Sequence, residues 1–140
     1  MSRLGRRLAF DYGDSRIGVA VCDPDGILAT PLEFLATKDP SLKISILALC
    51  EEYEPRKIYV GLPLNLSGQR SESTSKAIAF SELLAKLVTC PVELIDERLT
   101  TTSASASLSQ AGVSAKDQRA KIDSQSAVII LESGLAQDRE

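Results

Sequence analysis

Histidine is absent from this chain of 140 residues. Its absence excludes Ser-His-Asp and Cys-His catalysis, metal sites ligated by imidazole, and any reaction that needs a histidine base. If the protein is an enzyme that works near neutral pH, its acid–base chemistry must come from carboxylates, lysine, tyrosine or metal-bound water.

Cysteine is scarce, and the three cysteines are Cys22, Cys50 and Cys90. They are odd in number, lie far apart and form no C-x-x-C pair, so the sequence argues against a zinc site or a disulfide framework. We expect three buried free thiols, which are typical of a protein in the reducing cytoplasm.

Long apolar runs are also missing. No run approaches the ~20 residues that a transmembrane helix needs, and no signal-peptide core follows the basic first seven residues. We therefore expect a cytoplasmic protein without contact to a membrane. The net charge of −3 argues against a protein that coats nucleic acid nonspecifically, although a local basic patch stays possible.

The composition is that of one globular domain, with 44% hydrophobic and 25% charged residues. The chain is too short for two cores of ordinary size. We expect a single domain over residues 1–140, in which about residues 136–140 form a loose charged tail.

The hydrophobic residues follow two different periods along the chain, one typical of strands and one typical of helices. Short apolar segments separated by turn residues predict three strands near residues 8–10, 17–22 and 27–35; Pro31 in the last one indicates an edge strand or a bulge. Helical and strand patterns then alternate, with helices at 40–53, 77–87, 100–110 and 114–134, and strands at 57–60 and 92–95. A capping-box variant, Ser114-x-x-Asp117, would begin the last helix. This order predicts an α/β fold: a mixed five-stranded sheet whose first three strands form an antiparallel meander, flanked by helices on both faces.

Asp123 is the first residue that suggests chemistry. Helical periodicity places it on the side of the last helix that should face the sheet. A charge buried alone costs several kcal/mol, so this carboxylate must be neutralised, paired or bound to a metal. The alternative is an aspartate at the rim, paired with Arg119 or Lys121.

Two further acidic positions follow strands. Asp11 comes directly after an apolar strand and precedes Gly13, which would let a ligand or another backbone approach closely; an aspartate there also often starts a turn. Asp96 and Glu97 close the fifth strand. Since successive strand residues point to opposite faces, one of the two can join Asp11 and Asp123, but alternation alone does not choose between them.

Three converging carboxylates repel one another, at about 4 kcal/mol per like pair ~4 Å apart in an effective dielectric of roughly 20. Mg²⁺ or Mn²⁺ removes this repulsion and prefers oxygen ligands. Two such ions roughly 3.5–4 Å apart can activate water and stabilise the leaving oxygen of a phosphodiester. This chemistry needs no histidine.

The chain resembles the YqgF family, described both as pre-rRNA nucleases and as Holliday-junction resolvase-like proteins. Four motifs carry the resemblance: Asp11-Tyr12-Gly13-x-x-Arg16-Ile17-Gly18, Val60-Gly61-Leu62-Pro63-x-Asn65-x-x-Gly68, Asp96-Glu97-Arg98-Leu99-Thr100-Thr101 and Lys121-x-Asp123-x-x-Ser126-Ala127. The resemblance implies an RNase H-like fold and a metal-binding catalytic triad of Asp11, Glu97 and Asp123, which favours Glu97 over Asp96. It also implies endonucleolytic trimming of the small-subunit ribosomal RNA precursor. One departure is Ser126, where the family usually has alanine.

The remaining site predictions concern the substrate. The candidate substrate contacts are Gly13, Arg16, Asn65, Gly68, Arg70, Arg98 and Lys121. The loop from Gly61 to Gly68 could bind a phosphate or ribose through its backbone N–H groups, or could simply connect a strand to a helix. The basic residues could contact phosphates or only balance the acids.

The expected partner is nucleic acid, with structured RNA favoured and branched DNA as the alternative. A four-way DNA junction resolvase would have to cut two strands together as a symmetric dimer, whereas our expectation is a monomer or a weak homodimer. A binding module without catalysis is the third possibility. An actin-type ATPase shares the first hairpin, but the chain has no residues left for a second subdomain and contains no Walker motif.

Overall fold

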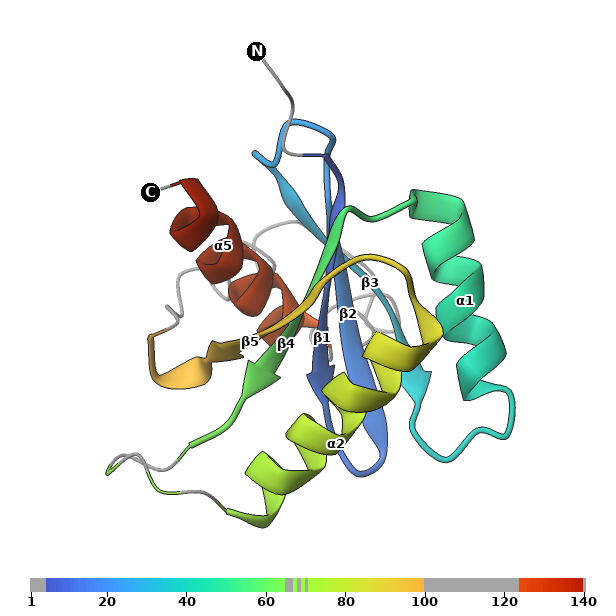
Figure 1. Ribbon diagram of the computed structural model, residues 1–140, viewed down its shortest axis with the longest axis vertical. Coiled ribbons are helices and arrows are strands. Elements are labelled where there is room, and N and C mark those ends of the chain that lie inside the picture. Colours follow the sequence, from blue (N-terminus) through green and yellow to red (C-terminus); the bar gives the residue numbers. More distant parts are fainter. Residues whose placement is uncertain (1–4, 65–66, 68, 70, 100–123, 140) are drawn as a thin grey trace, which may run out of the picture.

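The computed structural model describes residues 5–64, 67, 69, 71–99 and 124–139. Its centre is a five-stranded sheet with the strand order β3-β2-β1-β4-β5 (Figure 1). The strands are β1 (Arg7–Tyr12), β2 (Arg16–Cys22), β3 (Ala29–Ala36), β4 (Lys57–Leu62) and β5 (Val92–Asp96). All five predicted strands are present, and β3 with Pro31 is an edge strand, one of the two possibilities that its proline indicated.

Strand direction is mixed in the way that the sequence predicted. β1 pairs antiparallel with β2, and β2 pairs antiparallel with β3, which makes the expected meander. β1 pairs parallel with β4, and β4 pairs parallel with β5. The carboxyl ends of β1, β4 and β5 therefore lie at the same end of the sheet, where sites in α/β folds tend to form.

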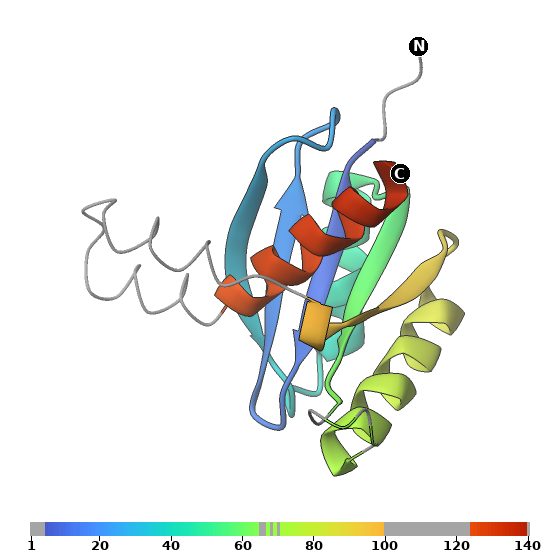
Figure 2. The same cartoon turned by 90° about the vertical axis from the view of Figure 1, so that its left-hand side faces the viewer.

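Helices cover both faces of the sheet (Figures 1 and 2). α1 (Leu42–Tyr53) and α2 (Glu72–Leu87) lie on one face, α5 (Gln125–Arg139) lies on the other, and a short 3₁₀ helix, η1 (Glu97–Leu99), follows β5. Each face has its own core: Leu8 and Phe10 pack on the α1 and α2 side, and Ala9 packs on the α5 side. None of the helices in the described part of the chain is both long and apolar enough to cross a membrane.

The start of α5 is attached to an irregularity in the sheet. The register between β2 and β3 shifts between Ile17 and Val19, which is the mark of a β-bulge. At this bulge the backbone N–H of Val19 donates to Ser124 Oγ at 3.0 Å, and Ser124 Oγ donates to the carbonyl of Leu32 at 2.6 Å. Ser124 is fully buried, so its hydroxyl fixes the beginning of α5 against β2 and β3.

The end of α5 corrects one prediction. We expected the last helix to stop near Gly134 and a loose tail to begin at about residue 136, but α5 continues to Arg139. Asp138 accepts a hydrogen bond from Tyr59 Oη at 2.5 Å and one from Lys57 Nζ at 2.9 Å. The charged residues that suggested a solvated tail therefore hold the helix on the sheet.

Other boundaries also differ from the predictions. The third strand begins at Ala29 instead of residue 27, because Asp23 Oδ1 accepts hydrogen bonds from the N–H groups of Ile27 and Leu28 at 2.7 and 2.8 Å and keeps both in a turn. α2 begins already at Glu72, within a stretch expected to be loop. A capping box causes this early start: Thr74 N donates to Ser71 Oγ, and Ser71 N donates to Thr74 Oγ1.

Candidate active site

The carboxyl ends of β1, β4 and β5 bring together three positions on the α5 side of the sheet. Because side chains alternate along a strand, the residues two positions after a member of the α5-side core point to that same face. Ala9 and Tyr59 are members of that core, and the strand positions two residues later are Asp11 and Gly61. The third position is Glu97, the first residue of η1 after β5. Register places Gly61 beside Ile95 of β5, and Glu97 comes two residues after Ile95, so the three positions lie at the same end of the sheet.

Gly61 makes room for the carboxylate of Glu97. A Cβ atom at Gly61 would lie 3.1 Å from Glu97 Cδ and 2.5 Å from Ile130 Cδ1 of α5. The Glu97 carboxyl group therefore lies over the backbone of β4 and next to the first turns of α5. A glycine inside a strand pattern often marks such a close approach.

The electrostatics of the site indicate two acidic groups close together and partly shielded from water. Burial, and then the charges of Asp11 and Asp96, raise the pKa of Glu97 to about 7. Burial also raises the pKa of Asp11, and a hydrogen bond with Ser126 in the first turn of α5 acts against this rise. Such a pair gains stability from a bound cation or a shared proton.

Asp96 has a different partner. Its carboxylate binds Arg98, with Oδ2 2.7 Å from Nη2 and Oδ1 2.9 Å from the backbone N–H. The side-chain hydrogen bond from Arg98 lowers the pKa of Asp96. Of the two neighbouring acids between which strand alternation could not choose, Glu97 is the one whose carboxylate lies over Gly61.

Gly13 lies in the turn from β1 to β2, and Arg16 is the first residue of β2. A Cβ atom at Gly13 would lie 2.6 Å from the carbonyl oxygen of Arg16, so the glycine allows another part of the backbone to approach, one of the two possibilities that the sequence left open. Arg16 is exposed, and its Cζ lies 5.2 Å from the centroid of the Phe34 ring. Arg98, also exposed, is the partner of Asp96.

The other predicted site residues lie outside the described residues. They are Asn65, Gly68, Arg70, Lys121 and Asp123, together with the predicted segments 100–110 and 114–117. Within the described ranges there is no group of three or more Cys, Asp or Glu side chains that could hold a metal.

Sequence reasoning missed two residues that position the site, and both left a signal. Ser124 is a polar residue next to Asp123 in the predicted last helix, and it provides the hydroxyl in the bulge. Gly61 was assigned only to a loop, although it belongs to β4 and lies under Glu97. A serine on a buried helix face and a glycine in a strand pattern are each typical of a close tertiary contact.

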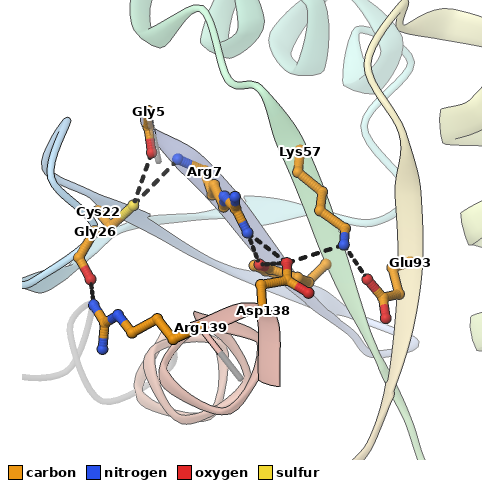
Figure 3. Close-up of polar contacts among 9 residues, drawn as sticks. Gly5, Arg7, Cys22, Gly26, Lys57, Glu93, Asp138 and Arg139 are labelled. Atoms are coloured by element: carbon orange, nitrogen blue, oxygen red, sulfur yellow. Dashed lines mark hydrogen bonds and ion pairs between the residues drawn. The ribbon is translucent and has the colours of Figure 1, made fainter. Parts of the chain in front are cut away.

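At the opposite end of the parallel strands, a second polar cluster fixes the end of α5 (Figure 3). Asp138 Oδ2 lies 2.5 Å from Arg7 Nη1 and 2.9 Å from Lys57 Nζ, and Lys57 also forms an ion pair with Glu93. Arg7 also donates a hydrogen bond to Tyr59 Oη. This cluster and Ser124 hold α5 at both ends, and α5 covers the face that carries Asp11 and Glu97.

Comparison with solved structures identifies the class of fold. The chain is similar to RuvC from Thermus thermophilus, with a TM-score of 0.51 and 14% identity over 96% of both chains. RuvC from the same organism in complex with a Holliday junction gives a TM-score of 0.56 and 13% identity, again over 96% of both chains. The fold is therefore α/β and RNase H-like, as expected.

Comparison with other sequences identifies the family. The model of the RuvX family, described as Holliday junction resolvase, matches residues 5–137. A protein from Streptomyces avermitilis is 48% identical over 139 residues, covering 98% of this chain and 89% of its own. A protein from Mycobacterium tuberculosis strain H37Ra is 51% identical over 134 residues, covering 94% of this chain and 78% of its own. Both carry the name "Putative pre-16S rRNA nuclease". The chain belongs to the RuvX family, the family that its motifs resemble under the name YqgF.

Proposed function

We propose that this protein is a metal-dependent endonuclease that hydrolyses phosphodiester bonds and processes the 5′ end of the small-subunit ribosomal RNA precursor. The observation that carries the proposal is the pair of partly buried acids, Asp11 and Glu97, at the carboxyl ends of the parallel strands β1 and β5, which lie on either side of β4. The names of the relatives support the nuclease activity and the choice of substrate. We propose that the protein works in the cytoplasm.

The chemistry of the donor set fits Mg²⁺ or Mn²⁺. Asp11 and Glu97 offer carboxylate oxygens, and the charge of Asp11 contributes to the raised pKa of Glu97, so a cation between them would remove an existing repulsion. We propose that Asp123, the residue before the anchored Ser124, is the third ligand. Bound divalent ions supply Lewis-acid chemistry, because they acidify water and offset the charge on phosphate oxygens.

The chain's own residues would position the substrate around these acids. Arg16 and Arg98 are exposed at this end of the sheet, and guanidinium groups bind phosphate oxygens in a defined geometry. Asp96 binds Nε and Nη2 of Arg98, which fixes the orientation of this guanidinium group. We propose that Gly13, Asn65, Gly68, Arg70 and Lys121 complete the contacts to the nucleic acid.

The test compares three acidic positions that differ in their surroundings. Asp11→Asn and Glu97→Gln should each abolish cleavage of a small-subunit rRNA precursor in Mg²⁺ or Mn²⁺, because each removes a carboxylate from the pair. Glu93→Gln is the matched control: it removes a carboxylate of β5 that is paired with Lys57 at the opposite end of the sheet, so cleavage should persist. Circular dichroism should show that all three variants are folded. Full activity of Asp11→Asn would overturn the proposal.

A second candidate function is the resolution of four-way DNA junctions. The description of the matched family model favours it, and the fold of RuvC is compatible with it. A resolvase must make two symmetric cuts and therefore needs a two-fold dimer, whereas we propose a monomer or a weak homodimer for the rRNA nuclease. Two measurements separate the two functions. The first is cleavage of a four-way junction by the wild type, and the second is the mass of the protein in solution, measured by light scattering. Tight binding of RNA or DNA without any metal-dependent product would instead indicate a binding module.

A further inference from the structure

Phe34 is a large aromatic residue that the fold does not use in its core. The chain has three phenylalanines, and Phe10 and Phe80 pack against each other in the core on the α1 and α2 side. Phe34 belongs to neither core cluster of the described residues and is only partly buried. Its recorded ring contact is with the guanidinium group of Arg16, at 5.2 Å. A partly exposed aromatic ring under an arginine calls for a functional explanation.

Strand register places this pair on the same face as the candidate active site. Ile17 and Leu35 are register partners, and both pack on the α1 and α2 side. Their chain neighbours Arg16 and Phe34 therefore point to the α5 side, which is the side of Asp11.

Gly18 lies between the pair and the acids. Asp11 is the register partner of Gly18 in β1 and β2, and on its other side Gly18 faces the bulge of β3 that contains Phe34. Adjacent strands are about 4.8 Å apart, so the backbone of Phe34 is roughly 10 Å from that of Asp11. Because Gly18 has no side chain, β2 places no side chain between Phe34 and Asp11 at this position. A distance of roughly 10 Å corresponds to about three stacked nucleotides at 3.4 Å each.

We propose that Arg16 and Phe34 form a stacking site for an unpaired base that lies a few nucleotides from the scissile phosphate. Aromatic rings and guanidinium planes are the two protein groups on which unstacked bases pack, largely without regard to base identity. The cation–π contact holds the guanidinium group against the ring, so the site is preorganised. A base inside a duplex is stacked on both faces and cannot use it. The substrate class is therefore a nucleic acid with single-stranded nucleotides beside the cut.

This inference rests on the proposed nuclease function, but its test measures binding and needs no cleavage. The probe is a single-stranded RNA with 2-aminopurine in place of one base, compared with the same RNA annealed to its complement, both in EDTA. Anisotropy gives the affinity and the quenching of 2-aminopurine reports stacking. Phe34→Leu should weaken single-strand binding roughly 5- to 150-fold, the effect of removing one stacked base, and should abolish the quenching. Duplex binding should change less than about twofold.

Two variants separate stacking from charge and from folding. Phe34→Trp keeps an aromatic surface and should restore both the affinity and the quenching. Arg16→Lys keeps the charge but loses the planar guanidinium group, so it should weaken single-strand binding. The matched control is Arg56→Lys at the opposite end of β1 and β4, where the backbone N–H of Arg56 donates to the carbonyl of Arg6. Arg16→Lys should weaken binding more than this control does. Single-strand binding by Phe34→Leu equal to that of wild type, or an equal loss on both probes, would overturn the site. If instead Asp11→Asn still cleaves while Phe34→Leu loses the quenching, the proposed active site fails and the stacking site stands.

Discussion

Replacing Ser124 with alanine should destabilise the protein far more than the loss of one small polar side chain normally does. The hydroxyl accepts from the Val19 N–H and donates to the Leu32 carbonyl inside the β2–β3 bulge, and the residue is fully buried. Ser124→Ala removes the partner of both backbone groups at once. The bulge keeps these two groups from pairing with each other as they would in a regular ladder.

The magnitude follows from the cost of unpaired buried groups. Each backbone group left without a partner costs about 1–3 kcal/mol, and a carbonyl with two lone pairs loses less than an N–H. We therefore expect the free energy of unfolding to fall by about 2–4 kcal/mol, out of the 5–15 kcal/mol typical of a domain. For a domain of this size the midpoint of thermal unfolding should fall by roughly 6–15 °C.

The assay is urea and thermal unfolding followed by circular dichroism, with Ser81→Ala as the matched control. Ser81 lies in α2, and its Oγ donates to the Ile78 carbonyl one turn earlier at 2.7 Å. That carbonyl is part of a helical ladder, so the control loses a hydrogen bond but leaves no backbone group stranded; we expect a cost below about 1 kcal/mol. If Ser124→Ala costs no more than Ser81→Ala, the argument from the bulge is wrong.

Three further predictions concern the acids and the two ends of α5. Because the pKa of Glu97 is raised to about 7 in the folded protein from an ordinary value of 4.5, the folded state binds the extra proton. The metal-free protein should therefore lose stability as the pH rises from about 4.5 to 7, and Glu97→Gln should show a flatter profile in urea unfolding. Gly61→Ala puts a methyl group 2.5 Å from Ile130 Cδ1 and 3.1 Å from Glu97 Cδ, so the Glu97 carboxyl must shift, and cleavage should fall at least about tenfold while far-ultraviolet circular dichroism stays unchanged; wild-type turnover would contradict this. Asp138→Ala leaves Arg7 and Lys57 without their shared acceptor and should lower the free energy of unfolding by about 1–3 kcal/mol, whereas an effect below about 0.5 kcal/mol would show that the cluster does not hold the helix.

The order of strands and helices could be predicted from the sequence because each element carries its own period and its own turn residues. Strand boundaries could not be predicted from the sequence where side chains bind the backbone. Ile27 and Leu28 were assigned to a strand because they are apolar and follow a turn, yet they are 77% and 66% exposed. Asp23 holds their N–H groups in the turn, and hydrophobic patterns contain no information about such a hydrogen bond.

Gly134 shows how the meaning of one residue depends on a distant neighbour. A glycine followed by charged residues is typical of a helix end, and this suggested that the last helix stops there. In the structure Gly134 lies within α5, and a Cβ atom at this position would lie 2.6 Å from the Tyr59 ring. The glycine therefore serves close packing of helix on sheet. No local pattern distinguishes these two uses, because the difference lies in a strand 75 residues earlier.

The choice between Asp96 and Glu97 was open for a related reason. β5 carries apolar residues on both faces, with Leu94 against the α1 and α2 side and Ile95 against the α5 side, so its sequence gives no alternating pattern from which to read direction. The direction becomes clear only when α5 lies over Ile95. Since α5 is held by Ser124 at one end and by Asp138 at the other, the geometry around Asp11 and Glu97 depends on contacts at both ends of that helix. Substitutions at either anchor should therefore disturb the acids even though neither anchor touches them.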